Sequence, residues 1–159
     1  MSKESEAATA KNRYLTFMLD QEHYGVEILR VKEIIGYQKP THIPRTPSYV
    51  LGVLNLRGVI IPIIDLRTKL GMVSVEPDTY TAIIIAQIHN SSIGFVVDQV
   101  QEVAAFSDEA IGEPPEFGAE VNTAYISGIA KSEKQVAMLL DLERIFDSQE
   151  AQSLQQLTD

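Results

Sequence analysis

The sequence predicts a mostly β protein, built from two related small barrels of about five short strands each and followed by a C-terminal helix. Three observations support this prediction: alternating apolar positions from Tyr14 onward, two segments that recur later in the same order, and an apolar stripe near the C-terminal end. Five short strands are too few to bury both faces of a flat sheet. Curling each unit into a barrel would remove exposed edges and enclose a core.

The first barrel is expected over about 14–70, after a polar segment. Residues 1–12 are polar, and we expect them to be a flexible tail that precedes a single folded domain over 13–159. Large apolar side chains occupy alternate positions over 15–19, which is typical of a strand with one buried face. The segment therefore predicts the first strand of the domain.

The rest of the first unit combines a proline-spaced segment with two further strands. Pro40, Pro44 and Pro47 exclude a central strand from their segment, because proline cannot donate to a ladder of backbone hydrogen bonds. Two apolar runs follow, and Arg57-Gly58 between them predicts a hairpin turn. Residues 71–79 are expected to be a linker.

An internal duplication predicts the second barrel, over about 79–141. The segment YGVEILRVKEI (24–34) aligns without gaps on IGFVVDQVQEV (93–103). Later, GVLNLRGVIIPIIDL (52–66) aligns on GIAKSEKQVAMLLDL (128–142). Each block has few identities, but both occur in the same order with the same apolar spacing, which indicates a repeated strand-rich unit.

The end of the chain predicts an amphipathic helix over about 142–157. Its apolar residues fall near one helical stripe, and glutamine and glutamate occupy much of the rest. The stripe consists of Leu142, Ile145, Phe146, Leu154 and Leu157. We expect this face to dock on the barrels.

Composition excludes several classes of function. The net charge of −9 argues against nucleic acid or an anionic membrane as a partner. No cysteine is present, which removes disulfides and thiolate metal sites. The N-terminus lacks the apolar stretch of a secretory signal, and the longest apolar runs are too short to span a bilayer. The sequence therefore predicts a cytoplasmic protein that does not insert in the membrane.

The charges are distributed unevenly along the chain. Residues 28–70 carry seven basic groups and two acidic ones, whereas residues 71–130 carry nine acidic groups and no basic one. Surfaces of opposite charge can bind two different partners or other copies of the same chain. Chance clustering of solubilising charge is the alternative explanation.

Residues that could perform catalysis are scattered. His23, His42 and His89 lack the spacing of a helical metal pair, and His23 and His89 fall in predicted hairpin turns, where a solvated side chain is expected. Asp65 and Asp141 occupy repeat-related positions before a leucine, which favours helix capping over an acid–base pair. No glycine-rich phosphate loop is present. The sequence therefore predicts no enzyme, no cofactor and no metal site.

Two runs of the first unit carry a specific resemblance. The run GVLNLRGVIIPIIDLR (52–67) and the upstream 24–34 resemble the signature of the CheW family, the coupling proteins of bacterial chemotaxis. The likeness extends from Tyr14 to the final helix. It implies two intertwined SH3-like five-stranded β-barrels with a C-terminal helix and no catalytic activity. It also implies a role in joining the cytoplasmic tips of methyl-accepting chemoreceptors to the regulatory domain of the histidine kinase CheA, and self-association in rings.

The resemblance also implies a receptor-binding groove between the two barrels. The matching positions are Val31, Glu33, Arg57, Asp98, Val100 and Val103. A groove floored by valines suits the apolar face of a helix. Two plainer interpretations remain open, since both repeat-related valines are equally compatible with a core position. Arg57 is likewise compatible with an internal ion pair to Glu33.

The acidic loop 107–123 contains the residues that we expect at a kinase or ring contact, Glu116 and Phe117. A phenylalanine among prolines and glutamates either anchors an interface or folds back as a plug.

Three other functions are compatible with parts of the sequence. The same scaffold could serve a non-flagellar chemosensory pathway. An SH3-like module for proline-rich peptides would need an aromatic groove, yet the chain has six tyrosines, five phenylalanines and no tryptophan. An enzyme with a site at a barrel mouth would need clustered polar groups, which the histidine spacing does not provide.

Overall fold

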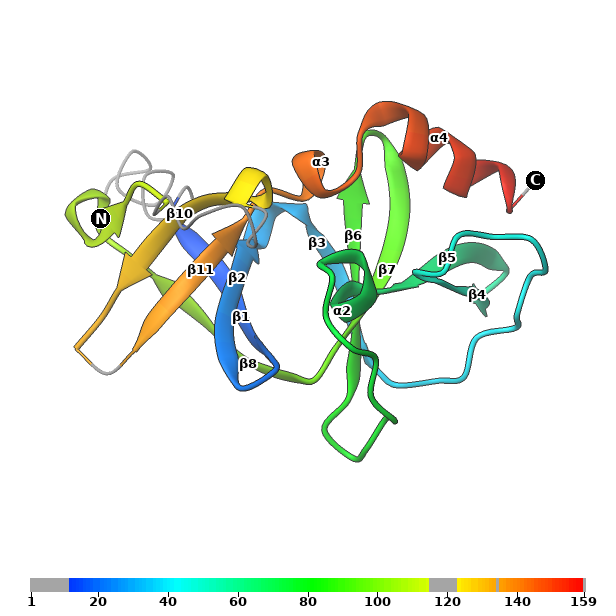
Figure 1. The fold of residues 1–159 in the computed structure, drawn as a ribbon, viewed down its shortest axis with the longest axis horizontal. Helices are drawn as coiled ribbons and strands as arrows, with labels where there is room; N and C mark the ends of the chain where they lie inside the picture. The colour runs from blue at the N-terminus through cyan, green and yellow to red at the C-terminus, as the bar shows by residue number, and fades with distance from the viewer. Residues whose placement is uncertain (1–11, 115–122, 134, 159) are drawn as a thin grey trace.

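The strands of the computed structural model form two sheets that lie side by side along its long axis (Figure 1). The structure describes residues 12–114, 123–133 and 135–158, so the expected tail lies outside it except for Asn12. In hydrogen-bonding order, sheet A contains β8 (Gln99–Ala105), β1 (Arg13–Leu19), β2 (Glu22–Glu27), β11 (Val136–Leu140), β10 (Ile126–Lys131) and β9 (Ile111–Gly112). Sheet B contains β3 (Val31–Gly36), β6 (Ala82–Ile88), β7 (Ser91–Val97), β5 (Val59–Asp65) and β4 (Val50–Leu56).

Short helical elements join or follow these strands. They are η1 (Ile28–Arg30), α2 (Leu66–Lys69), η2 (Asp108–Ala110), η3 (Thr123–Tyr125), α3 (Leu142–Ile145) and α4 (Ser148–Gln156). The mostly β fold with a short C-terminal helix is thereby confirmed. The predicted hairpin at Arg57-Gly58 is also present, and both of its residues have positive φ, as a tight two-residue β-turn requires.

The predicted duplication is visible in the strand pairing. Strands β1, β2 and β3 occupy in one repeat the places of β6, β7 and β8 in the other, and β4 and β5 correspond to β10 and β11. The parallel pair β2–β11 has its counterpart in the parallel pair β7–β5. Each sheet therefore takes strands from both halves of the chain, so the two units are intertwined as expected.

Three apolar clusters form the interior of the protein. The largest lies between the two sheets and joins them. This central core joins Leu15 and Phe17 of sheet A to Ile84 and Phe95 of sheet B, and Phe146 covers it from the C-terminal segment. A second cluster lies inside sheet B and a third inside sheet A. Strand β6 is buried on both faces, with Ile83 and Ile85 in the sheet B cluster and Ile84 in the central core.

The sheets curl but do not close, which corrects the expectation of closed barrels. Among the described residues, the first and last strands of each sheet share no backbone ladder. The cluster inside sheet B nevertheless takes side chains from all five strands: Ile35, Leu54, Ile61, Ile83 and Val96. The outer edge of β4 is covered by the proline-spaced segment, where Thr41 and Val53 exchange two backbone hydrogen bonds of 2.9 and 3.0 Å. In a closed barrel β4 would have no free edge. Here the contact with Thr41 covers that edge instead.

Both predicted aspartate caps are confirmed. Asp65 accepts a hydrogen bond from the backbone N–H of Arg67 at 3.1 Å, and Asp141 accepts one from Glu143 at 3.0 Å. Each carboxylate thus satisfies a backbone donor that the first turn of its helix leaves free.

The single helix expected over about 142–157 is divided into α3 and α4. Phe146 adopts an extended conformation with φ −121° and ψ 121°, which ends α3. Asp147 and Glu150 then form a capping box that starts α4. The bend allows Phe146 to enter the central core while Ala151 and Leu154 of α4 remain buried.

A buried cation fixes α4 to α2. The ammonium group of Lys69 lies 2.6 Å from a carboxylate oxygen of Glu150 and 4.5 Å from the ring centroid of Tyr49. The Tyr49 hydroxyl donates to the same oxygen at 3.2 Å. Burial, together with this carboxylate, raises the pKa of Tyr49 to about 12, so the hydroxyl keeps its proton under ordinary conditions.

His89 differs from the solvated turn histidine that the sequence predicts. Its Nε2–H donates to the backbone carbonyl oxygens of Glu143 and Phe146, at 2.9 and 2.8 Å. These carbonyls belong to the end of α3, where the helix leaves its acceptors unsatisfied. His89 therefore ties the β6–β7 hairpin to the junction of the two C-terminal helices.

We expect Gly52→Ala to lower the free energy of unfolding by about 2–6 kcal/mol, because strained φ and overpacking each cost about 1–3 kcal/mol. Gly52 has φ +144°, and a Cβ atom there would collide with the carbonyl oxygen of Thr41. Gly36→Ala is the matched control, since a Cβ atom at Gly36 meets nothing within 4 Å. Urea denaturation of both variants measures the difference, and equal midpoints would contradict the proposed edge contact.

Candidate functional site

A β-bulge in β3 places two aliphatic side chains on the same face. Val31 pairs with Ala86 and Ile34 with Ile84, while Lys32 is the extra residue that the bulge accommodates. Ala86 and Ile84 both belong to the central core. Because directly opposed residues share a face, Val31 and Ile34 also lie on the side of the central core.

Strand β8 repeats this arrangement in sheet A. Val100 pairs with Phe17 and Val103 with Leu15, again with an irregular register between the pairs. The buried Thr16 hydroxyl spans the irregularity, since it donates to the carbonyl of Glu102 at 2.8 Å and lies 3.2 Å from the amide nitrogen of that residue. The buried hydroxyl thereby satisfies backbone groups that the regular ladder would have paired.

We call Val31, Ile34, Val100 and Val103 the edge aliphatics. Val31 and Val100 are partly buried against the central core, whereas Ile34 and Val103 are 42% and 41% exposed. Ile34 and Val103 occupy equivalent positions in the two repeats, and sequence reasoning singled out only Val103. The repeat alignment itself was the signal that could have identified Ile34, because 24–34 and 93–103 end on these two residues.

Glu33 and Arg57 lie together, but on the other side of β3 from Val31. Glu33 pairs with Ile85, which belongs to the cluster inside sheet B. The Arg57 guanidinium donates to both carboxylate oxygens of Glu33, at 3.0 and 2.5 Å, and its side chain is 74% exposed. The sequence did not decide whether this ion pair forms. In the structure it joins edge strand β3 to the β4–β5 hairpin. The hydrogen bond from Arg57 lowers the pKa of Glu33, which keeps the carboxylate ionised.

The Asp98 carboxylate is already occupied by contacts within the chain. Its two oxygens accept hydrogen bonds from Arg67 at 2.8 and 2.5 Å, and one of them also accepts the backbone N–H of Asp20 at 2.9 Å. Burial opposes ionisation of Asp98, but the hydrogen bonds from Arg67 and Asp20 outweigh it and hold the pKa below its usual value. The stabilisation is therefore present near neutral pH and lost as the pH falls through that lowered pKa.

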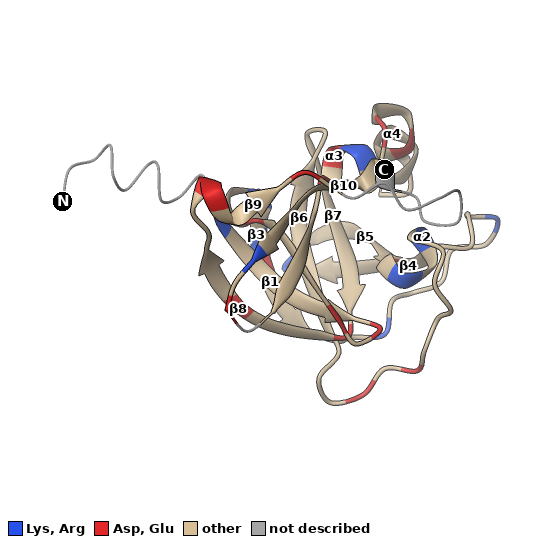
Figure 2. Cartoon of the chain, turned by 60° about the vertical axis from the view of Figure 1, so that its left-hand side comes forward, with Lys and Arg blue, Asp and Glu red and all other residues tan. Residues whose placement is uncertain are grey.

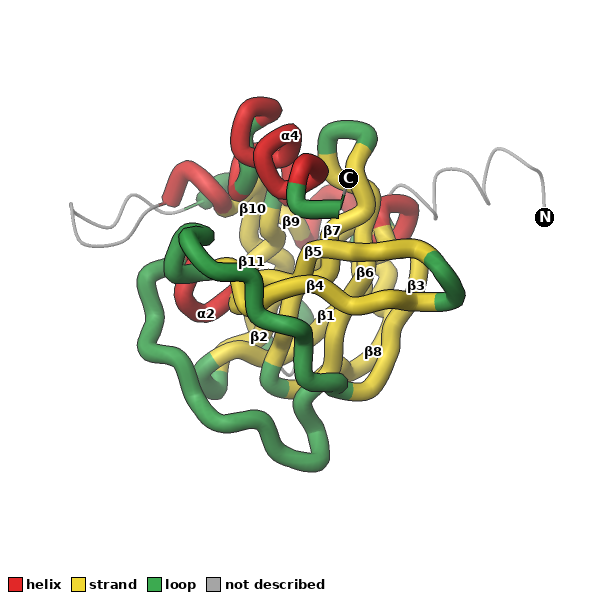
Figure 3. The backbone as a smooth tube through the Cα atoms, turned by 90° about the vertical axis from the view of Figure 1, so that its right-hand side faces the viewer, coloured by secondary structure: helices red, strands yellow, loops and turns green. Residues whose placement is uncertain are grey.

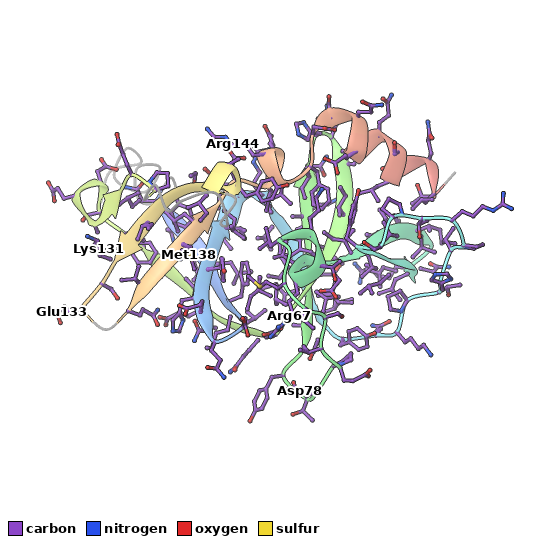
Figure 4. The ribbon with its side chains drawn as sticks, viewed as in Figure 1. Arg67, Asp78, Lys131, Glu133, Met138 and Arg144 are labelled. Atoms are coloured by element: carbon purple, nitrogen blue, oxygen red, sulfur yellow. The ribbon has the colours of Figure 1, made fainter. Side chains whose placement is uncertain are left out.

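Arg67 is the central residue that sequence reasoning missed. Its side chain extends from α2, is only 12% exposed and lies between the two sheets (Figure 4). Besides Asp98, its guanidinium donates to the Val73 carbonyl at 3.2 Å and lies 3.9 Å from the Asp20 carboxylate. Arg67 thereby connects α2, the β1–β2 turn, the β7–β8 junction and the segment after α2.

A second ion pair lies at the other crossing between the sheets. Arg30 follows β2 and lies 2.7 Å from Glu143 of α3. Glu143 occupies in the second repeat the position that Arg67 occupies in the first. The two crossings thus have opposite charges at the repeat-related positions 67 and 143, although the partner residues do not align, since Arg30 matches Gln99 in the repeat.

The remaining expected site residues, Glu116 and Phe117, lie outside the described ranges. Within those ranges, no group of three or more His, Asp or Glu side chains is arranged to hold a metal ion. No helix of the described chain is long and apolar enough to cross a membrane.

Comparison with known proteins matches this architecture to one family. The family model of the CheW-like domain covers residues 13–150. The chain belongs to the CheW family. The chemotaxis protein CheW of Klebsiella aerogenes is 39% identical over 142 residues, which cover 89% of this chain and 86% of the relative. The chemotaxis protein CheW of Bacillus subtilis is 32% identical over 141 residues, which cover 89% and 90%.

A solved structure shows the same fold. The crystal structure of the scaffolding protein TtCheW from Thermoanaerobacter tengcongensis aligns with a TM-score of 0.80 and 33% identity, over 88% of this chain and 97% of the other. CheW-family proteins are non-catalytic scaffolds of chemotaxis signalling, so this CheW-like chain is a coupling protein and not an enzyme. The resemblance seen in the sequence is confirmed.

We expect the two arginine ion pairs to differ in their contribution to stability. Arg67→Ala should lower the free energy of unfolding by about 2–4 kcal/mol, because it leaves the partly buried Asp98 carboxylate unpaired. Arg57→Ala should cost far less, because the pair that it removes is exposed. Urea denaturation at neutral pH tests the comparison. A larger loss for Arg57→Ala would reverse the assignment.

Proposed function

We propose that this chain couples methyl-accepting chemoreceptors to the histidine kinase CheA in the cytoplasm, and that the edge aliphatics receive the receptor tip. The observation that carries the proposal is the matched pair of bulged edge strands. Each strand offers two aliphatic side chains on the face of the central core, at positions related by the internal repeat. Exposed aliphatic side chains beside a core suit the apolar face of a helix.

The repeat also bears on the shape of the partner. Two equivalent edges present equivalent aliphatic pairs, Val31 with Ile34 and Val100 with Val103. The family resemblance implies that the receptor tip is a helical hairpin, whose two arms run in opposite directions, so each arm would meet one edge. The receptor tip therefore fits a pseudo-twofold surface better than a single helix would.

Glu33 and Arg57 give this surface a charged flank. Their ion pair is bidentate, and the Arg57 side chain remains 74% exposed. A receptor carboxylate that approaches the hairpin would compete with Glu33 for the guanidinium, whose planar geometry suits carboxylates. Arg57 and Glu33 would then select receptors by charge while contributing little to folding.

Asp98 acts as a positioning residue in this proposal. Its carboxylate is held by Arg67, and its backbone N–H donates to the Met18 carbonyl at 3.1 Å. These contacts fix the start of β8 two residues before Val100. Asp98 would therefore influence receptor binding through the placement of Val100 and Val103, without itself touching the receptor.

The kinase regulatory domain would bind elsewhere, at the acidic loop that contains Glu116 and Phe117. The distribution of charged residues supports contacts between two different surfaces of the protein. Lys39 and Arg45 are exposed beside sheet B, whereas Glu109 and Glu113 are exposed beside sheet A. Heterologous contacts between such surfaces close into rings when the rotation between neighbours permits it. Self-association in rings follows from the same arrangement.

We expect Val103→Asp to weaken binding of a purified receptor cytoplasmic fragment at least about tenfold, because it places a charge against an apolar helix face. Val136→Asp is the matched control, since Val136 is 51% exposed at the β10–β11 hairpin, whereas Val103 is 41% exposed on β8. Isothermal titration calorimetry with both variants measures the difference. Equal losses of affinity would remove the edge aliphatics from the receptor site.

Arg57→Ala should also weaken binding of the receptor fragment while leaving the melting temperature nearly unchanged, because the Arg57–Glu33 pair is exposed. Glu33→Gln is a useful companion variant, since it frees the guanidinium for a receptor carboxylate and should bind at least as well as the unmodified chain. Unimpaired binding by Arg57→Ala would show that the pair is purely structural.

A further inference from the structure

The segment 71–81, which connects α2 to β6, has no helix or strand yet is held at several points (Figure 3). Near its start, the Ser74 hydroxyl donates to the Asp65 carboxylate at 2.7 Å, and the Val73 carbonyl accepts from Arg67. Near its end, the Asp78 carboxylate accepts the backbone N–H of Tyr80 at 2.8 Å. The segment is therefore fixed by these polar contacts, together with Met72, which packs against the central core near the start of the segment.

These contacts present three large apolar side chains to solvent. Val73 is 82% exposed, Val75 54% and Tyr80 65%. They account for three of the eight large apolar side chains that are prominently exposed in the described chain. Such a concentration on one short segment, rimmed by polar residues, is typical of an interaction surface.

A hollow of about 180 Å³ lies beside the segment. Its apolar lining comes from Val75 and Pro77 of the segment and from Tyr37, Leu51 and Val96 of the adjoining sheet B region. The last three residues are also the partly buried rim of the cluster inside sheet B. The hollow is thus the open end of that curled sheet, and it has room for one aliphatic side chain.

The charge around the hollow is negative. Its charged lining residues are Asp65, Glu76 and Asp98 against the single cation Arg67, and Asp78 lies at the outer end of the segment (Figures 2 and 4). Arg67, which also lines the hollow, is already paired with Asp98. An occupant must therefore bring its own positive charge.

We propose that Val73, Val75, Tyr80 and the hollow form a second docking surface, for a partner segment with an aliphatic side chain flanked by lysine or arginine. The aliphatic side chain enters the hollow, and the cation lies against Glu76 and Asp78. This surface includes none of the edge aliphatics. It therefore allows a second protein to bind while the edge strands are occupied, and it does not depend on the receptor assignment.

The probe is a blocked ten-residue peptide of alternating leucine and lysine, titrated into the isotopically labelled full chain and followed by NMR. We expect amide shifts centred on residues 73–81, and at least a tenfold weaker dissociation constant for Glu76→Lys/Asp78→Lys. A leucine–glutamate peptide should bind this reversed variant and not the unmodified chain. Val73→Ser/Val75→Ser/Tyr80→Ser should bind neither peptide.

Glu109→Lys/Glu113→Lys is the matched control, because it changes the net charge equally at exposed acidic residues beside sheet A. It should bind the lysine peptide as the unmodified chain does. Equal weakening by both charge reversals would overturn the proposal, as would shifts centred on β3, β8 or residues 108–113. A dimer that is detected by sedimentation and abolished by the triple serine variant would overturn it too, because a second copy would then be the occupant.

Discussion

The architecture depends on the two places where the chain crosses from one sheet to the other. After β2 the chain leaves sheet A to form an edge of sheet B, and after β7 it leaves sheet B to form an edge of sheet A. The largely buried pair Arg67–Asp98 holds one of these crossings, and the half-exposed pair Arg30–Glu143 lies at the other. Because the crossings exchange edge strands, neither sheet can be assembled from one half of the chain, and the central core forms only when both halves meet.

The repeat makes the backbone nearly symmetrical, whereas the charged side chains do not follow that symmetry. Arg67 in the first repeat corresponds to Glu143 in the second, and Arg57 corresponds to Glu133. The two halves of the molecule therefore present similar shapes with different charges. In the function proposed above this difference has a physical use, since equivalent aliphatic edges would receive two arms of one partner while unlike outer faces would bind different proteins.

Much of the fold followed from local patterns. The hairpin at Arg57-Gly58, the caps at Asp65 and Asp141 and the repeated strands were predicted, because turn geometry, capping and alternation depend on residues close in sequence. Local reasoning failed where a distant partner decided the outcome. The C-terminal helix is broken where Phe146 enters the central core, and the outer edge of the open sheet B is covered by the segment with Thr41.

The sequence by itself determined the strands, the duplication and, through its resemblance, membership of the non-catalytic CheW family. The resemblance also named the residues of a receptor site, and that assignment stays a prediction. Only the tertiary structure decided which of them share a face, because a single bulge residue such as Lys32 reverses the direction of every side chain beyond it. For the same reason Val31 and Ile34 face the central core, whereas Glu33 lies on the opposite side and pairs with Arg57.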